Sequence, residues 1–276
     1  MPKIVREFEK EINRAEPDIN LARAALLVAR AINPRVDVAA SLAKLDAMAQ
    51  SVRDAVADDA SAAEKFAALN EYFFGREQFS GNRADYYHPQ NSFLNYVLVT
   101  KIGLPITLSV IYLEIGWRLD LPVAGIGLPG HFVVAFFGGD DVVYVDPFND
   151  GQLLTEDDCL DIAQVPEDDR IPFRRDYLKP MTKKAILYRM LLNLKHVYVT
   201  HQEWDRAHRV ADLLVSLRPG ELNQLRDRGL IAYRLDRLQD AVFDIRQYLL
   251  QNPNASDADW LKNHLENLQT KLLRLN

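Results

Sequence analysis

Apolar residues recur at every third or fourth position over much of the chain, which is the spacing of an amphipathic helix. One such stripe spans residues 38–56 and consists of Val38, Leu42, Leu45, Ala49, Val52 and Val56. A shorter stripe over residues 66–73 stops before Gly75, a residue typical of the ends of helices. The first hundred residues are therefore predicted to be mainly helical, with a polar loop over residues 77–91.

The pattern changes after Gly103. Residues 106–119 are almost entirely apolar, which predicts a helix buried on most sides, and Pro105 suits its first turn. Three short runs of β-branched and aromatic residues, 123–127, 131–137 and 142–146, predict strands. One helix followed by adjacent strands indicates an α+β arrangement rather than alternating βαβ units.

The segment 156–180 has the composition of a linker. It contains Pro166, Pro172 and Pro180 together with many charged residues. We expect it to run over the surface, and the chain after it is predicted to be helical to its end.

The C-terminal part contains an internal repeat. Ala207 and Pro219 recur 34 residues later as Ala241 and Pro253. A period of 34 residues, with a small residue where two helices cross and a terminal proline, is typical of tetratricopeptide repeats. An unrelated pair of helical hairpins is the alternative.

Composition narrows the class of protein. The 276 residues carry a net charge of −6, which argues against a protein whose whole surface binds nucleic acid. A hydrophobic content of 48% excludes wholesale disorder, and a single cysteine excludes an intramolecular disulfide or a cysteine-only zinc site. The chain opens with no secretory leader pattern and has no uncharged apolar run of about 18 residues, so we expect a cytoplasmic protein that does not enter membranes.

His131 and Asp146 are the best candidates for chemistry. His131 begins one predicted strand and Asp146 ends the next, so an antiparallel pair can bring them together. A carboxylate beside an imidazole is the orienting half of a nucleophile–His–Asp triad. On spacing alone, a satisfied structural pair explains the two residues equally well.

Five separated motifs carry a resemblance to a known family. They are Gly81-Asn82-Arg83-x-Asp85-Tyr86-Tyr87, Asn91-Ser92-Phe93-Leu94-Asn95, Gly103-Leu104-Pro105-Ile106-x-Leu108-Ser109-x-x-Tyr112, Gly127-Leu128-Pro129-Gly130-His131-Phe132 and Asp146-Pro147-Phe148-Asn149. Together they resemble the bacterial SirB-type regulators, and a related domain occurs in a eukaryotic F-box protein.

The resemblance implies a mostly helical α+β chain in two domains. Residues 1–180 would hold N-terminal helices and a degenerate papain- or transglutaminase-like core, a helix packed on an antiparallel sheet. Residues 181–276 would form an α-helical array of tetratricopeptide-like repeats.

The resemblance also implies a catalytic pattern that this chain does not complete. In catalytic relatives a cysteine begins the buried helix, and His131 and Asp146 match the histidine and aspartate that complete the triad. The cysteine position falls on or beside Pro105, and the one cysteine, Cys159, comes after Asp146, where we expect a half-buried packing role.

Two substitutes for the thiol remain open. Thr107 or Ser109 follows Pro105 on the same helix and carries a hydroxyl, or His131 and Asp146 act on a bound water. We expect no cofactor and no metal, because the other histidines and the acidic runs lack ligand spacing.

Three functions follow as hypotheses. The favoured one is a non-catalytic adaptor or regulator that binds a protein or peptide through its helical repeats. The degenerate cleft could contribute to this binding through Asn91, Asn95, Thr107, Ser109 and the His131–Asp146 pair. The others are an acyl-transfer or amide-hydrolysing enzyme that uses the pair with a non-cysteine nucleophile, and a structural subunit of a larger complex.

Overall fold

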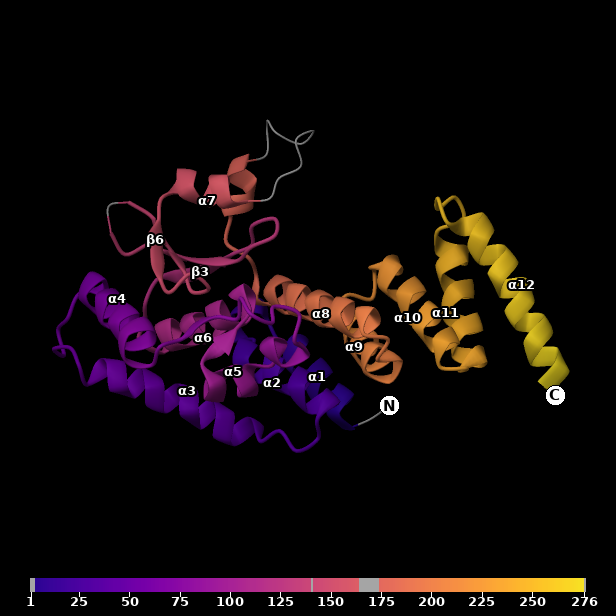
Figure 1. Ribbon diagram of the computed structural model, residues 1–276, viewed down its shortest axis with the longest axis horizontal. Coiled ribbons are helices and arrows are strands. Elements are labelled where there is room, and N and C mark those ends of the chain that lie inside the picture. The colour runs from indigo at the N-terminus through magenta and orange to yellow at the C-terminus, as the bar shows by residue number, and fades with distance from the viewer. Residues whose placement is uncertain (1–2, 140, 164–173, 276) are drawn as a thin grey trace. The chain divides into compact units, whose positions relative to one another are not determined.

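The chain folds into two compact units. We describe a computed structural model in which residues 3–139, 141–163 and 174–275 are described (Figure 1). The core unit comprises Lys10–Met190, and the helical unit comprises Met1–Glu9 with Leu191–Asn276. The mostly helical α+β class predicted from the sequence is confirmed.

The core unit holds most of the short elements, and the first and last helices of its range cross into the other unit. In chain order the elements up to residue 200 are α1 (Lys3–Ile12), η1 (Glu16–Asp18), α2 (Leu21–Ile32), α3 (Val38–Arg53), α4 (Ala62–Asn70), η2 (Glu71–Arg76), β1 (Ser80–Gly81), η3 (Pro89–Ser92), α5 (Leu94–Thr100), β2 (Ile102–Gly103), α6 (Pro105–Arg118), β3 (Val123–Ile126), β4 (Val133–Phe136), β5 (Val143–Asp146), β6 (Gln152–Leu154), α7 (Glu156–Ile162), η5 (Arg174–Leu178) and α8 (Lys183–Thr200).

Helix α6 is the centre of the core unit. It begins at Pro105, as predicted, and every residue from Pro105 to Gly116 is buried. Helices α2, α3 and α5 pack on one side of it, and strands β3 and β4 of the sheet pack on the other (Figure 1). Its almost entirely apolar sequence is thus explained by packing on most sides.

The main sheet is an antiparallel meander in the order β3-β4-β5-β6. The three predicted strands are present, and β6 is an addition that the sequence did not indicate. A second, two-stranded sheet pairs β1 with β2 in parallel, Ser80 with Ile102, inside a region predicted as loop and helix.

The prediction of a linker over residues 156–180 is wrong for its first part, which forms α7. Thr155 and Asp158 form a capping box at the start of this helix, in which the side chain of each residue accepts a hydrogen bond from the backbone N–H of the other. Cys159 has no exposed surface and packs into a cluster with buried residues of the sheet, so it is more deeply buried than predicted. Residues 164–173 of the expected linker lie outside the described residues.

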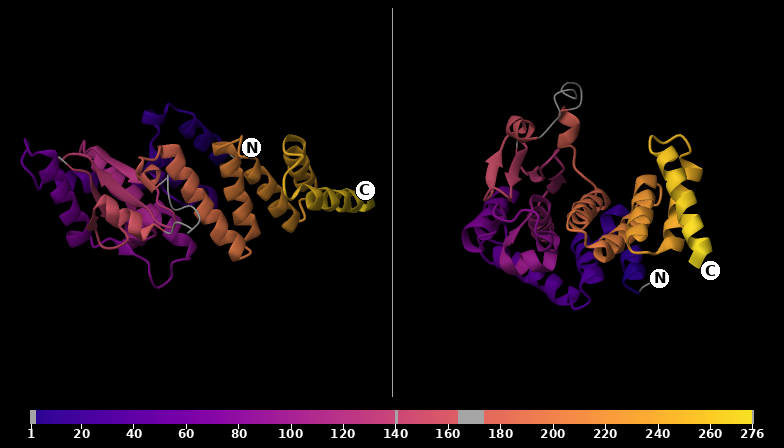
Figure 2. Two further views of the ribbon diagram at one scale, coloured as in Figure 1. Left: turned by 90° about the horizontal axis from the view of Figure 1, so that it is seen from above. Right: turned by 45° about the vertical axis from the view of Figure 1, so that its right-hand side comes forward.

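The helical unit repeats at the predicted period of 34 residues. Its further helices are α9 (Trp204–Leu217), α10 (Leu222–Arg234), α11 (Leu238–Gln251) and α12 (Ala258–Leu275), which follow one another along the array (Figure 2). Helices α9 and α11 begin and end 34 residues apart, and Ala207 and Ala241 are both fully buried. Gln202 and Asp236, each two residues before the start of its helix, both adopt left-handed backbone angles, with φ of 57° and 55°.

A buried carboxylate ties α6 to its neighbours. Glu114 is 4% exposed and accepts a hydrogen bond from the backbone N–H of Ala22 at the start of α2, at 2.8 Å. It also pairs with Arg118, which reaches Asp46 on α3.

No helix that the structure describes is long and apolar enough to cross a membrane.

Replacing Glu114 is expected to destabilise the core unit strongly. Glu114→Ala leaves the buried Ala22 N–H without its acceptor and removes one of the two carboxylates that bind Arg118, and a buried donor left unpaired costs about 1–3 kcal/mol in unfolding free energy. Asp46→Ala removes the exposed partner of the same arginine and is expected to cost less than about 1 kcal/mol. Urea unfolding measures both, and equal losses would contradict the assigned role of Glu114.

Candidate functional site

The register of the sheet brings His131 to Asp146. Val134 on β4 lies opposite Val145 on β5, so the residues just before β4 lie beside the end of β5. The imidazole Nε2 of His131 is 2.7 Å from Oδ2 of Asp146. The Asp146 side chain is 1% exposed and that of His131 is 14% exposed, so the pair is almost withdrawn from water.

The Asp146 carboxylate is fully satisfied. Besides His131, it accepts hydrogen bonds from the side-chain amide of Asn149 at 2.7 Å and from the backbone N–H groups of Phe148 and Asn149. Burial acts to raise the pKa of Asp146, but the hydrogen bonds and the neighbouring His131 outweigh it and hold the pKa below its usual value. The carboxylate therefore stays charged and orients the imidazole.

Asn149 connects this pair to the polar loop. Its Oδ1 accepts a hydrogen bond from Arg83 at 2.8 Å, and the Arg83 guanidinium also lies over the Phe148 ring. Gly81 lies so close to Phe148 that a Cβ atom there would be 2.5 Å from its ring and its carbonyl oxygen. The loop over residues 77–91 is thus packed against the turn that follows Asp146.

Arg189 holds the backbone before β4. Its guanidinium donates two hydrogen bonds of 2.6 Å, to the carbonyl oxygens of Leu128 and His131, and lies over the Phe132 ring. Burial lowers the pKa of Arg189. Neither Arg83 nor Arg189 was among the residues singled out from the sequence, and only the position of Arg83 within a motif hinted at a role.

The start of α6 offers no nucleophile to His131. Pro105 occupies the first helical position and is buried. The hydroxyls of Thr107 and Ser109 are buried, and neither has a hydrogen-bond partner among the described residues, so neither is hydrogen-bonded to the imidazole. The residues outside the description contain no Ser, Thr or Cys.

Cys159 is not poised for chemistry. It has no exposed surface, and burial, with the nearby carboxylates of Asp146, Asp158 and Glu156, raises the pKa of its thiol to about 12. A thiolate is the reactive form, so this thiol is inert near neutral pH.

The two cleft asparagines lie in different surroundings. Asn91 is 1% exposed and bonds to Asn82 and to the carbonyl oxygens of Asp85 and Tyr86, which fixes the loop. Asn95 lines a separate cavity of about 330 Å³ beside the start of α3, whose lining contains neither His131 nor Asp146. The structure therefore does not group Asn95 with the pair.

The part of the chain that the structure describes holds no cluster of three or more His, Cys, Asp or Glu side chains able to bind a metal ion.

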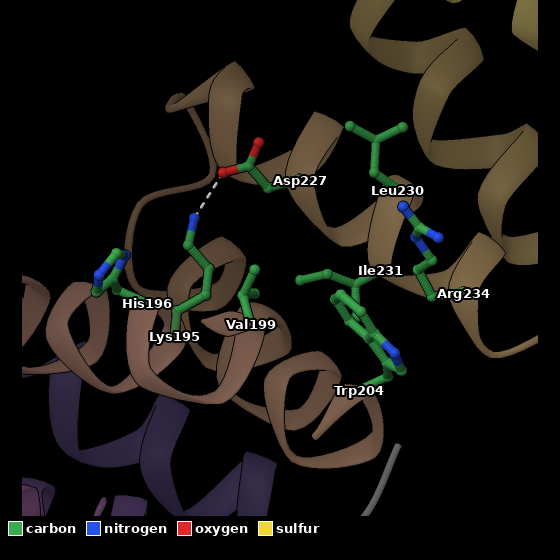
Figure 3. Close-up of a pocket in the computed structure, with 8 residues that line it drawn as sticks. All are labelled: Lys195, His196, Val199, Trp204, Asp227, Leu230, Ile231 and Arg234. Atoms are coloured by element: carbon green, nitrogen blue, oxygen red, sulfur yellow. Dashed lines mark hydrogen bonds and ion pairs between the residues drawn. The ribbon is translucent and has the colours of Figure 1, made fainter. Parts of the chain in front are cut away.

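A second candidate site lies in the helical unit. A groove of about 370 Å³ runs between α8 and α10 and is closed at its base by the first residue of α9 (Figure 3). We call it the α8–α10 groove; its lining residues are Lys195, His196, Val199, Trp204, Asp227, Leu230, Ile231 and Arg234.

Comparison with known proteins gives two domain matches. The family model described as the transglutaminase-like superfamily matches residues 39–192, and a tetratricopeptide-repeat model matches residues 194–266. No solved structure matches the chain.

Among curated relatives, a UPF0162 protein of Xylella fastidiosa is 34% identical over 260 residues, 92% of each chain. A UPF0162 protein of Vibrio cholerae is 26% identical over 91% of this chain and 93% of its own. F-box only protein 21 of Pongo abelii is 26% identical over 66% of this chain but only 30% of its own length.

Asp146 is expected to give the fold a distinct pH dependence. Because its folded pKa lies below its unfolded value, its bonds stabilise the fold above the usual pKa near 4, and this stability is lost as the pH falls through the lowered pKa. We expect Asp146→Asn to be less stable than wild type at pH 7, with the gap in urea midpoint narrowing below about pH 4. Asp150→Asn, at an exposed neighbour, is the matched control, and a gap that stays constant with pH would contradict the assignment.

Cys159 is expected to resist alkylation in the folded protein. With its thiol buried and its pKa near 12, iodoacetamide at pH 8 should modify it only after urea unfolds the chain. Mass spectrometry of native and unfolded samples measures this directly. Rapid modification of the native chain would show that the thiol is accessible and reopen it as a nucleophile.

Proposed function

The chain belongs to the transglutaminase-like superfamily and to the family of the UPF0162 proteins, and on this premise we propose that it is a non-catalytic, protein-binding adaptor or regulator. The observation that carries the proposal is the lack of any thiol or hydroxyl bonded to His131 among the described residues. Without a nucleophile beside it, an oriented imidazole has no side-chain proton to remove, and no side chain is present to take up the acyl group.

The tetratricopeptide repeats supply the binding role. Arrays of such helices present grooves to peptides and partner helices, and the α8–α10 groove is a surface of this kind. The proposal includes a division of the chain at residue 180, with a degenerate transglutaminase-like domain before it and the repeats after it. It also includes a regulatory role in the cytoplasm of a bacterium, in keeping with the likeness to the SirB-type regulators.

The His131–Asp146 pair is, in this proposal, part of the scaffold. Its carboxylate is satisfied by groups of the same unit, and through Asn149 and Arg83 it holds the loop over residues 77–91. The pair thereby serves the fold without a substrate.

An enzyme is the second candidate, and one observation favours it. The His131–Asp146 distance of 2.7 Å and the burial of the pair retain the geometry of a triad's orienting half. An acyl-transfer or amide-hydrolysing reaction would then use a water molecule activated by His131.

Affinity capture from the native lysate separates the two candidates. Wild type, His131→Ala and a variant of the α8–α10 groove, Val199→Asp with Leu230→Asp, serve as baits. We expect wild type and His131→Ala to capture the same partner and the groove variant to lose it. The reason is that binding would bury the two new carboxylates against an apolar surface, which is costly. Retention by the groove variant and loss with His131→Ala would favour the enzyme. Thermal unfolding shows that each bait is folded.

A further inference from the structure

We propose that the α8–α10 groove binds a partner segment in which a bulky apolar side chain lies next to an acidic one. This inference rests on the proposed function, protein binding through the helical unit, and specifies the chemistry of the partner. It follows from the apolar floor of the groove and from the unequal electrostatics of its two ends.

The floor of the groove is apolar and can hold a large side chain. Val199 of α8 and Ile231 of α10 face each other across it, and the indole of Trp204 forms its base (Figure 3). Its volume of about 370 Å³ is at the lower end of ligand pockets, which span about 300–1,000 Å³. The groove therefore has room for a bulky apolar side chain such as Leu, Met or Phe.

One end of the groove is electrostatically satisfied. Lys195 pairs with Asp227 at 2.6 Å and donates a second hydrogen bond to Gln224. The other oxygen of Asp227 accepts two hydrogen bonds from Arg226. Neither charge at this end therefore needs a group from a partner.

The other end carries a cation without an acidic partner among the described residues. The guanidinium of Arg234 lies 5.5 Å from the centre of the Trp204 ring, and the side chain is exposed at the mouth of the groove. Asp236, two residues after Arg234, pairs with Lys271, and Asp205, which follows Trp204, pairs with Arg237.

This asymmetry orients a bound segment. An apolar side chain on the floor removes Val199 and Ile231 from water, and a carboxylate beside it meets the Arg234 guanidinium while that cation stays on Trp204. A basic segment would instead meet Arg234 as a like charge.

Selection from a phage-displayed random 12-residue peptide library on the full-length chain tests the proposal. We expect enriched peptides to share a bulky apolar residue with Asp or Glu beside it. Arg234→Glu should lower the affinity for the selected peptides by at least about tenfold. When this variant is itself the bait, the selected peptides should carry Lys or Arg beside the apolar residue. Arg246→Glu, the same charge change at an exposed position of α11 outside the groove, is the matched control and should leave binding unchanged.

Three outcomes would overturn the proposal: no enrichment, peptides without an acidic preference, or equal binding by wild type and Arg234→Glu. Each leaves the adaptor function intact if a partner is still captured through the α8–α10 groove in the lysate experiment. Loss of that capture dependence would instead remove the proposed function itself.

Discussion

The buried carboxylate of Asp146 is the constraint on which the core unit's candidate site depends. A charge that is 1% exposed must be compensated in place, and four hydrogen bonds do this. They bend the chain after β5, hold the imidazole of His131, and position Asn149 so that Arg83 can reach it. The geometry of a catalytic pair is thus also the geometry that satisfies a buried acid.

Among the described residues of the same unit, no thiol or aliphatic hydroxyl is hydrogen-bonded to His131. Helix α6 begins with Pro105, and its two aliphatic hydroxyls, those of Thr107 and Ser109, are buried in the core. The one thiol sits on α7 with a raised pKa. In the helical unit, by contrast, an open groove has an apolar floor, and Arg234 at one end has no acidic partner among the described residues. We therefore propose binding as the activity of this chain.

The sequence predicted what short-range patterns encode. The apolar run over 106–119 gave α6, the β-branched runs gave three strands, and the recurrence of Ala207 as Ala241 gave the repeat. Helix α7 was missed because only Cys159 among its residues is buried, although Thr155 and Asp158 carry a capping-box signal. β6 was missed because it is short and exposes Leu153.

The site was predictable only in part, because its other members depend on tertiary contacts. His131 and Asp146 could be paired from strand order alone. Asn91 and Asn95 lie four apart in sequence, yet one is bound within the loop and the other faces a different cavity. Lys195 and Asp227, which pair at one end of the α8–α10 groove, are 32 residues apart in the sequence, so their ion pair becomes evident only in the folded structure.

We propose that the protein binds its partner without changing it covalently. The most direct test is the intact mass of the captured partner after incubation with wild type and, separately, with His131→Ala. We expect the captured partner to have the same mass in both samples. A gain or loss of mass that appears only with wild type would contradict it and identify the His131–Asp146 pair as catalytic.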